Sequence, residues 1–217
     1  MGFVLQTSKR ANPGPVESRA TARAGAIGRA YSASRVKSKL RALVLVDRYR
    51  LCKVAADKRR QSVGENAPDT VEDWVARVVG HPAVSDWVTV DQEMITGFAD
   101  VTRDWNFLHV DEEAASAAGM DRTIAHGFLT LSLMSPMRMN AGLLPCPGLK
   151  MAMNYGLDAV RFLAPVYAGD RIRGHFTTEE IVEAHPGRYR ERLKASVEIE
   201  GQEKPALVAT WLALYVT

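Results

Sequence analysis

Residues 124–139 read Ile-Ala-His-Gly-Phe-Leu-Thr-Leu-Ser-Leu-Met-Ser-Pro-Met-Arg-Met, and this stretch decides the fold. Almost every residue in it is apolar or small, and no polar face runs along it. Because a helix without a polar face is buried on most of its sides, we expect a long central helix here. Pro136 should kink or end that helix, because proline lacks an amide hydrogen and its ring clashes with the preceding turn.

The residues that follow the central helix are predicted to form strands separated by turns. The predicted strands occupy residues 150–166, 171–183, 188–200 and 205–216. Turns such as Gly169-Asp170 and His185-Pro186-Gly187 separate neighbouring strands. Consecutive strands joined by short turns pair antiparallel. The pattern therefore predicts an α+β domain in which an antiparallel sheet wraps around the central helix.

Further helices and a short strand are predicted before the central helix. Residues 71–79 carry apolar side chains at helical spacing after Thr70, which is suited to cap the start of a helix. Residues 87–90 fit a short strand. Asp91 and Asp111 can each cap a further helix, because their side chains can accept hydrogen bonds from the first helical amides.

The charge of the chain is distributed unevenly, which separates an N-terminal extension from the domain. Residues 1–60 carry 15 Lys or Arg against 3 Asp or Glu, a net charge of +12, whereas the remaining residues carry 13 against 22, a net charge of −9. We expect residues 1–60 to be a basic, partly disordered extension, in which residues 36–60 could form a basic helix. Residues 61–69 read as a linker, and the domain is expected to occupy residues 70–217.

Composition also indicates the cellular compartment in which the protein is expected. Cys52 and Cys146 lack the spacing of metal ligands or of a disulfide framework, so we expect two unpaired thiols in a reducing, cytoplasmic setting. The Arg-rich and Ser-rich start would instead indicate an organellar matrix if it is a transit peptide. No apolar run reaches the roughly 18 residues that a membrane span needs. The basic extension leaves contact with nucleic acid open, although no nucleic-acid partner is expected.

A carboxylate and an imidazole lie five residues apart in the segment Asp104-Trp105-Asn106-Phe107-Leu108-His109. On a continuous helix, residues five apart point about 140° away from each other, so Asp104 and His109 can converge only if the backbone turns between them. Asn106 is suited to such a turn, because its side chain can bond nearby backbone groups. An acid–base pair beside the start of the central helix could transfer protons and stabilise a developing negative charge. Taken alone, Asp104 could also be a helix-end cap, and His109 a partly buried structural residue.

The segment resembles the motif of the MaoC-like hydratase/dehydratase family, Gly-Asp-x-Asn-Pro-x-His-x-Asp followed by His-Gly at the start of a central helix. The matching residues are Asp104, Asn106, His109, Asp111, His126 and Gly127. Arg103 stands where the family has glycine, and could pair with Asp104 or point to solvent. Phe107 stands where the family has proline. The resemblance covers about residues 68–217, and it is closest to the NodN-like branch, through residues 87–92, 98–102 and 153–162.

The resemblance implies a hot-dog fold and an enzyme that adds water to a trans-2-enoyl-CoA to give an (R)-3-hydroxyacyl-CoA, or that runs the reverse dehydration. Asp104 and His109 would bind and activate the water, while the Gly127 N–H and a neighbouring amide would polarise the thioester carbonyl. Asn106 would hold the loop or the water, and His126 would orient the helix start or line the site. The residues that would line the acyl path, or else merely pack within a strand, are Asn154, Tyr155 and Arg161.

The resemblance also implies which cofactors and partners to expect. No metal and no redox cofactor is expected, because the substrate arrives as a thioester of CoA or of a carrier protein. A homodimer with one continuous sheet is implied, with the sites near the interface. Two alternatives stay open. One is a thioesterase on the same fold, which would not need His109, and the other is a non-catalytic acyl-thioester-binding protein, which Arg103 and Phe107 leave open.

Overall fold

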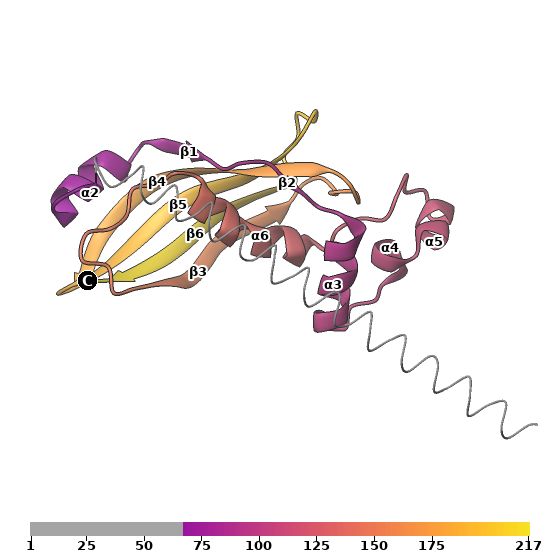
Figure 1. Cartoon of the computed structure of the whole chain (residues 1–217), viewed down its shortest axis with the longest axis horizontal. Coiled ribbons are helices and arrows are strands. Elements are labelled where there is room, and N and C mark those ends of the chain that lie inside the picture. The colour runs from indigo at the N-terminus through magenta and orange to yellow at the C-terminus, as the bar shows by residue number, and fades with distance from the viewer. Residues whose placement is uncertain (1–66) are drawn as a thin grey trace, which may run out of the picture. The chain divides into compact units, whose positions relative to one another are not determined.

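A computed structural model describes residues 67–217 (Figure 1). Its helices are α2 (Val71–Val78), α3 (Gln92–Thr102), α4 (Phe107–Val110), α5 (Glu112–Ala117) and α6 (Gly127–Asn140). Its strands are β1 (Pro82–Val84), β2 (Val88–Thr89), β3 (Met151–Phe162), β4 (Arg171–His185), β5 (Arg188–Ile199) and β6 (Leu207–Val216). The predicted extension over residues 1–60, its helix over 36–60 and most of the predicted linker over 61–69 lie outside the described residues.

The strands form one antiparallel sheet with β1 and β3 at its two edges. The strand order is β1-β4-β5-β6-β3, and the short β2 pairs with β4 as well. The predicted α+β architecture, an antiparallel sheet around one long helix, is confirmed. Strand β1 is not among the strands predicted from the sequence, and its first residue is Pro82. Proline is tolerated as the first residue of an edge strand, because its missing amide hydrogen faces no neighbour there.

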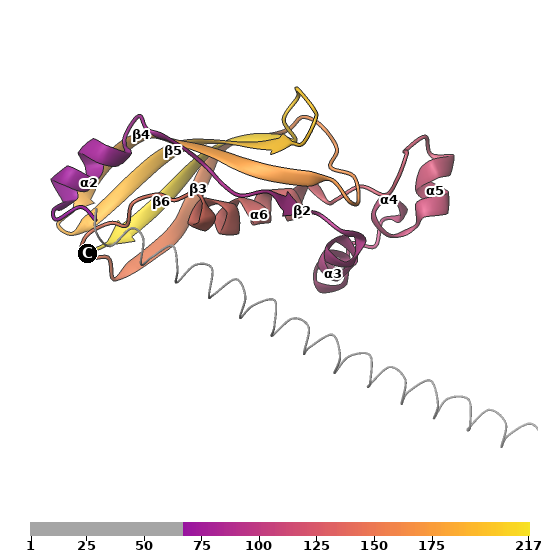
Figure 2. The ribbon, with the colours of Figure 1, turned by 45° about the horizontal axis from the view of Figure 1, so that its top comes forward.

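Helix α6 lies against one face of the sheet, as Figures 1 and 2 show from two directions. Leu129, Met134 and Met137 of α6 share a buried cluster with Phe176 and Leu193 of the sheet. Buried residues alternate along β5 and β6, so one set of side chains meets the helix and the other points away from it. Burying each large apolar side chain contributes about 1.5–3 kcal/mol, which makes this interface the main core.

Helix α6 does not end at its proline. It begins at Gly127 with His126 as N-cap, passes through Pro136 and ends at Asn140, so the prediction that Pro136 could end the helix is wrong. Met134 and Met137 are both buried on either side of the proline. Their packing holds the last turn and outweighs the hydrogen bond that the proline removes.

Large apolar side chains remain exposed on β3 and on the adjoining side of α6. They are Phe128, Met139, Met151, Met153, Tyr155, Leu157 and Phe162. The prediction that the central helix is buried on most of its sides is therefore wrong for this side of the single chain. Residues of α6 and β3 together line two hollows here, so the exposed helix side and the sheet edge adjoin.

Three of the helices begin at the predicted caps. Thr70 accepts a hydrogen bond from the Asp73 N–H at 3.1 Å, and Asp91 and Asp111 cap α3 and α5 in the same way at 2.8 and 3.0 Å. Such a cap contributes about 1 kcal/mol. Both views place α3, α4 and α5 together beyond the end of the sheet at which α6 begins (Figures 1 and 2).

Two expectations about the setting of the chain can be compared with residues 67–217. None of their helices is long and apolar enough to span a bilayer. Cys146 is a free, buried thiol, as predicted, whereas Cys52 lies outside the described residues. Burial and the nearby Glu191 charge raise the pKa of the Cys146 thiol to about 11, so it stays protonated at neutral pH and is a poor nucleophile.

Candidate active site

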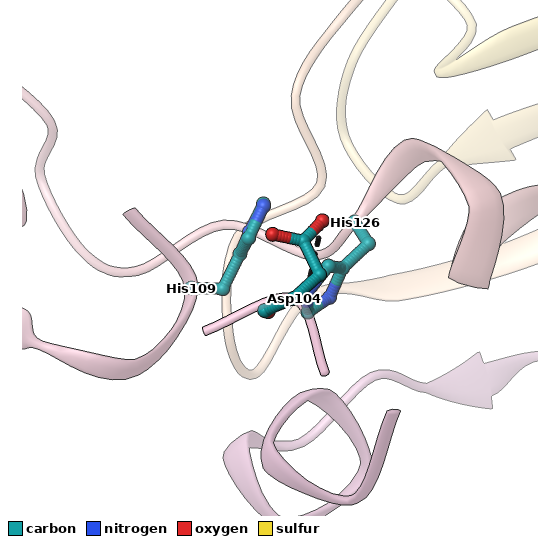
Figure 3. Close-up of side chains that lie close together, drawn as sticks. All are labelled: Asp104, His109 and His126. Atoms are coloured by element: carbon teal, nitrogen blue, oxygen red, sulfur yellow. Dashed lines mark hydrogen bonds and ion pairs between the residues drawn. The ribbon is translucent and has the colours of Figure 1, made fainter. Parts of the chain in front are cut away.

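Asp104 and His109 converge beside the start of α6, because the backbone turns between them as predicted (Figure 3). Arg103 ends α3 in the left-handed conformation with a φ of 61°, and Asn106 then caps the short helix α4, which carries His109. The Asn106 side chain accepts a hydrogen bond from the Leu108 N–H at 3.1 Å. Of the two roles expected for Asn106, the structure therefore shows that of holding the loop.

The hydrogen bonds of His109 leave one ring nitrogen available as a proton acceptor. Its Nδ1 lies 2.7 Å from the Ile124 carbonyl oxygen, which can only accept, so Nδ1 is the protonated nitrogen. In the neutral ring Nε2 then carries a lone pair. The Asp104 side chain is 58% exposed. Its carboxylate and one ring nitrogen of His109 lie within 4.8 Å of each other, a gap that one water with two hydrogen bonds of about 2.8 Å can span.

His126 contacts both members of this pair from the protein interior. Its ring is 3% exposed and stacks on His109, with centroids 3.7 Å apart and an interplanar angle of 26°. Its Nε2 donates to the Asp104 carbonyl oxygen at 2.9 Å and lies 4.0 Å from Asp104 Oδ2. Its Nδ1 is buried and bonds to no described residue. The geometry makes His126 a support for Asp104 and His109 and leaves it no open face to line the site.

The start of α6 presents free backbone amides. His126 gives no side-chain cap to the helix, and the N–H groups of Gly127 and Phe128 donate to no described residue. The first amides of a helix carry partial positive charge, so they form a natural site for an oxygen anion. Glycine at position 127 has a packing cause as well, because a Cβ there would lie 3.1 Å from the Phe162 ring.

The donor set at Asp104, His109 and His126 offers few open ligand atoms to a metal ion. One potential ligand atom from each residue lies within 4.8 Å of the other two. However, each ring donates one N–H to a backbone carbonyl, and the second nitrogen of His126 is buried. Only the Asp104 carboxylate and His109 Nε2 are then open, which is fewer than the three protein ligands of a catalytic zinc site.

Two polar residues that the sequence analysis did not select lie behind His109. Gln92 Nε2 donates to the His109 carbonyl oxygen at 2.8 Å, and Thr123 Oγ1 donates to Gln92 Oε1. Thr123 is buried, so this small network fixes the backbone of His109 relative to α3 and to the segment before α6. No sequence spacing relates the three positions, and hence no pattern could identify them.

The three candidates on β3 do not join the pair. Asn154 and Tyr155 border a cavity of about 300 Å³ beside the middle of α6, with Leu131 and Ser135. Arg161 borders a different cavity, of about 410 Å³, and its guanidinium bonds the Val160 carbonyl. Neighbouring residues of a strand point to opposite faces, so Phe162 reaches Gly127 while Arg161 points away from it. Arg161 therefore lies on the other face of β3 from Gly127, and a role in lining the acyl path stays a prediction for it.

The structure explains why the family motif has glycine and proline where this chain has Arg103 and Phe107. The backbone at Arg103 has a positive φ, a conformation that glycine adopts without steric cost. Phe107 is the first residue of α4, where proline is favoured. Arg103 is exposed and forms no ion pair with Asp104 or with any other residue of the described part of the chain, so both departures are conformational.

We expect Arg103→Gly to raise the free energy of unfolding by about 0.5–1 kcal/mol, because it relieves the left-handed backbone. Urea unfolding followed by circular dichroism would measure this. The control is Val101→Gly in the exposed part of α3, which should lower the free energy of unfolding by a similar amount. Equal destabilisation by both glycines would contradict a strained Arg103.

Comparison with known proteins gives consistent similarities. A model of the MaoC like domain matches residues 75–199. The chain is 40% identical over 148 residues to 3-hydroxyacyl-thioester dehydratase Z of Mycobacterium tuberculosis, covering 68% of this chain and 97% of that protein. It is 44% identical over 131 residues to Nodulation protein N of Rhizobium leguminosarum bv. viciae, covering 60% of this chain and 81% of that protein. A solved monoamine oxidase regulatory protein from Archaeoglobus superposes with a TM-score of 0.59 at 26% identity, over 70% of this chain and 96% of that chain.

Proposed function

The chain belongs to the MaoC-like dehydratase family, and from that premise we propose that it adds water to trans-2-enoyl thioesters, or removes it from 3-hydroxyacyl thioesters. The observation that carries the proposal is the pairing of an exposed carboxylate with an imidazole that keeps one unprotonated nitrogen, with the carboxylate and one ring nitrogen within 4.8 Å of each other. Its relative from M. tuberculosis is named a 3-hydroxyacyl-thioester dehydratase, which supports the same class of substrate.

In the proposed hydration, Asp104 and His109 hold the attacking water between them. The water oxygen bonds to the β-carbon of the enoyl group and gives one proton to the pair, and the pair returns one proton to the α-carbon. Such acid–base catalysis contributes about 10²–10⁴-fold to the rate. Dehydration follows the same path in reverse. We expect the (R)-3-hydroxyacyl product, no metal and no redox cofactor, with CoA or a carrier protein as the thioester carrier.

The free amides at the start of α6 complete the proposed site. As the water adds, negative charge develops on the thioester oxygen. The N–H groups of Gly127 and Phe128 can donate to that oxygen, because neither has another partner among the described residues. One preorganised donor of this kind contributes roughly 3–4 kcal/mol to stabilising the transition state.

The test is the loss of enoyl-thioester absorbance when the purified full-length protein is mixed with crotonyl-CoA or a longer trans-2-enoyl-CoA. We expect hydration without release of free CoA, and chiral analysis of the product tests the (R) configuration. Release of free CoA without hydration would indicate the thioesterase alternative instead. Neither reaction on any chain length would leave the non-catalytic acyl-thioester-binding protein as the better account.

We expect His126 to act as a positioning residue for Asp104 and His109. His126→Phe keeps a ring to stack on His109 but loses the donor to the Asp104 carbonyl, whereas His126→Asn keeps a donor and loses the stack. Each should lower kcat about 10–100-fold with little change in KM, since a misplaced pair still binds substrate. Steady-state kinetics checks this, with circular dichroism as the folding control. Loss through a raised KM alone would contradict the positioning role.

We also propose a homodimer that pairs through β3. This edge strand is 12 residues long and carries several exposed apolar side chains, the kind of edge that proteins cover. The double substitution Tyr155→Lys and Leu157→Lys should therefore yield a monomer in light scattering coupled to size exclusion, because like charges then face each other across the two copies. Val84→Lys on the opposite edge strand β1 is the control and should stay dimeric. A monomeric wild-type protein would overturn the dimer.

A further inference from the structure

A single stripe of α6 lines three successive hollows along the helix, and the first of them includes Gly127 at the helix start. The residues of the stripe are Gly127, Thr130, Leu131, Met134, Ser135 and Arg138, at the spacing of one helix face. The hollows have volumes of about 290, 300 and 440 Å³. The second and third share Ser135, Asn154 and Trp211, so they adjoin. From Gly127 to Arg138 the helix rises about 16 Å.

The last and largest hollow, which we call the Arg138 cavity, lies between the second half of α6, α2, β3 and β6. Its walls include Trp74, Cys146, Trp211 and Tyr215, all buried, and its cationic wall residue is Arg138. The guanidinium lies 5.7 Å from the centre of the Trp211 ring. Mostly apolar and aromatic walls with a few polar residues, here Ser135, Arg138, Asn154 and Tyr215, are typical of a small-molecule site, and the volume falls in the usual range.

Arg138 belongs to a buried polar network that the proposed mechanism does not use. Its Nη2 donates to Glu191 Oε2 and to the Tyr215 hydroxyl, both at 2.5 Å. Glu191 is completely buried, and the hydroxyls of Tyr215 and Thr178 donate to it as well, each at 2.6 Å. Burial by itself lowers the pKa of Arg138. The neighbouring Tyr215 and Glu191 raise it by more, so the pKa of Arg138 is raised. The network is therefore an ion pair of zero net charge.

The donors and acceptors of this network are not balanced. The Glu191 carboxylate accepts three hydrogen bonds, from Arg138, Thr178 and Tyr215. Arg138 donates only two hydrogen bonds to described residues, and both come from Nη2. Arg138 Nε is buried without a partner among the described residues, yet the side chain keeps 19% exposure. A guanidinium has five N–H donors, and Arg138 Nη1 is neither buried nor bonded to a described residue, so Nη1 can still donate to a ligand in the cavity. A plain alkyl group placed there would desolvate these donors without replacing the lost water.

We infer that the Arg138 cavity receives the far end of the acyl group and selects long chains that end in a neutral oxygen acceptor, such as a ketone or hydroxyl. The second hollow and the Arg138 cavity are lined mostly by apolar residues, so they suit the acyl group rather than the polar CoA. A neutral oxygen fits better than a carboxylate, because Glu191 already balances the charge of Arg138. This inference rests on the proposed function, since it takes the reacting double bond to lie at the start of α6.

The test compares three substrates with the full-length protein: crotonyl-CoA, trans-2-dodecenoyl-CoA and the same dodecenoyl chain with a ketone at its penultimate carbon. We expect kcat/KM for the ketone to exceed that for the alkyl chain by about tenfold, the usual effect of one hydrogen bond to a charged group. The double variant Arg138→Met and Glu191→Gln, which leaves no unpaired charge, should bring this ratio to about one. Arg138→Lys, which keeps the charge, should retain part of the preference.

The ratio of kcat/KM for the ketone to kcat/KM for the alkyl chain is measured with the same preparation of each variant. A smaller fraction of folded enzyme lowers both values equally and leaves the ratio unchanged. Arg171→Met removes an exposed ion pair with Glu200 and is the matched control, for which the ratio should stay at the wild-type value. A wild-type ratio of one or less, with the alkyl chain turned over, would overturn this inference and leave the proposed function standing. A preference for the ketone that persists in the double variant would also overturn this inference and leave the proposed function standing. No turnover of any substrate, crotonyl-CoA included, would remove the proposed function and this inference together.

Discussion

Asp104→Asn and His109→Ala are each expected to lower kcat/KM for the hydration of crotonyl-CoA by about 10²–10⁴-fold. Asparagine keeps the size of Asp104 but cannot take a proton from water. Alanine removes the Nε2 lone pair that the hydrogen bond from Nδ1 to the Ile124 carbonyl leaves available. The measurement is the initial rate of absorbance loss, with circular dichroism spectra to confirm folding.

The pair should behave as a unit, because both residues act on the same water. The double variant Asp104→Asn and His109→Ala should therefore lose little more activity than the worse of the two single variants. Asp100→Asn is the matched control: its exposed carboxylate bonds the Trp105 indole and takes no part in the proposed reaction. Turnover that survives His109→Ala, or equal losses from Asp100→Asn, would contradict the assigned roles.

The sequence predicted the parts of the fold that depend on local rules. The caps at Thr70, Asp91 and Asp111 lie where short polar side chains precede apolar periodicity, and the structure has each of them. The four long strands were predicted within a few residues of their ends, because turn residues separate them. The convergence of Asp104 with His109 was also predictable, since their spacing requires a turn.

The parts that the sequence could not predict depend on contacts between distant segments. Gln92 supports His109 across 17 residues, and Arg138 pairs with Glu191 across 53 residues. In the sequence Arg138 looks like one polar residue at the end of an apolar helix, and Glu191 like an ordinary acid in a charged strand. Only the register of the sheet places Glu191 on the face that meets α6.

That buried pair carries the second large effect, now on stability. We expect Arg138→Met to lower the free energy of unfolding by about 3–5 kcal/mol, because it leaves the charge of the fully buried Glu191 uncompensated. Glu191→Met should cost less, since the Arg138 side chain is 19% exposed and can recover water. Urea unfolding of each variant, followed by circular dichroism, gives the two values.

The variant that removes both charges separates the cost of an unpaired charge from the net contribution of the pair. Arg138→Met combined with Glu191→Met should be more stable than Arg138→Met alone, because a buried ion pair can be replaced by apolar groups at little cost once both charges are gone. The control Arg171→Met breaks an ion pair in which both side chains are 46% exposed, and it should cost at most about 1 kcal/mol. If the two single substitutions cost the same and add in the double variant, Glu191 does not depend on Arg138. Arg138 and Glu191 would then be two independent polar residues beside the Arg138 cavity.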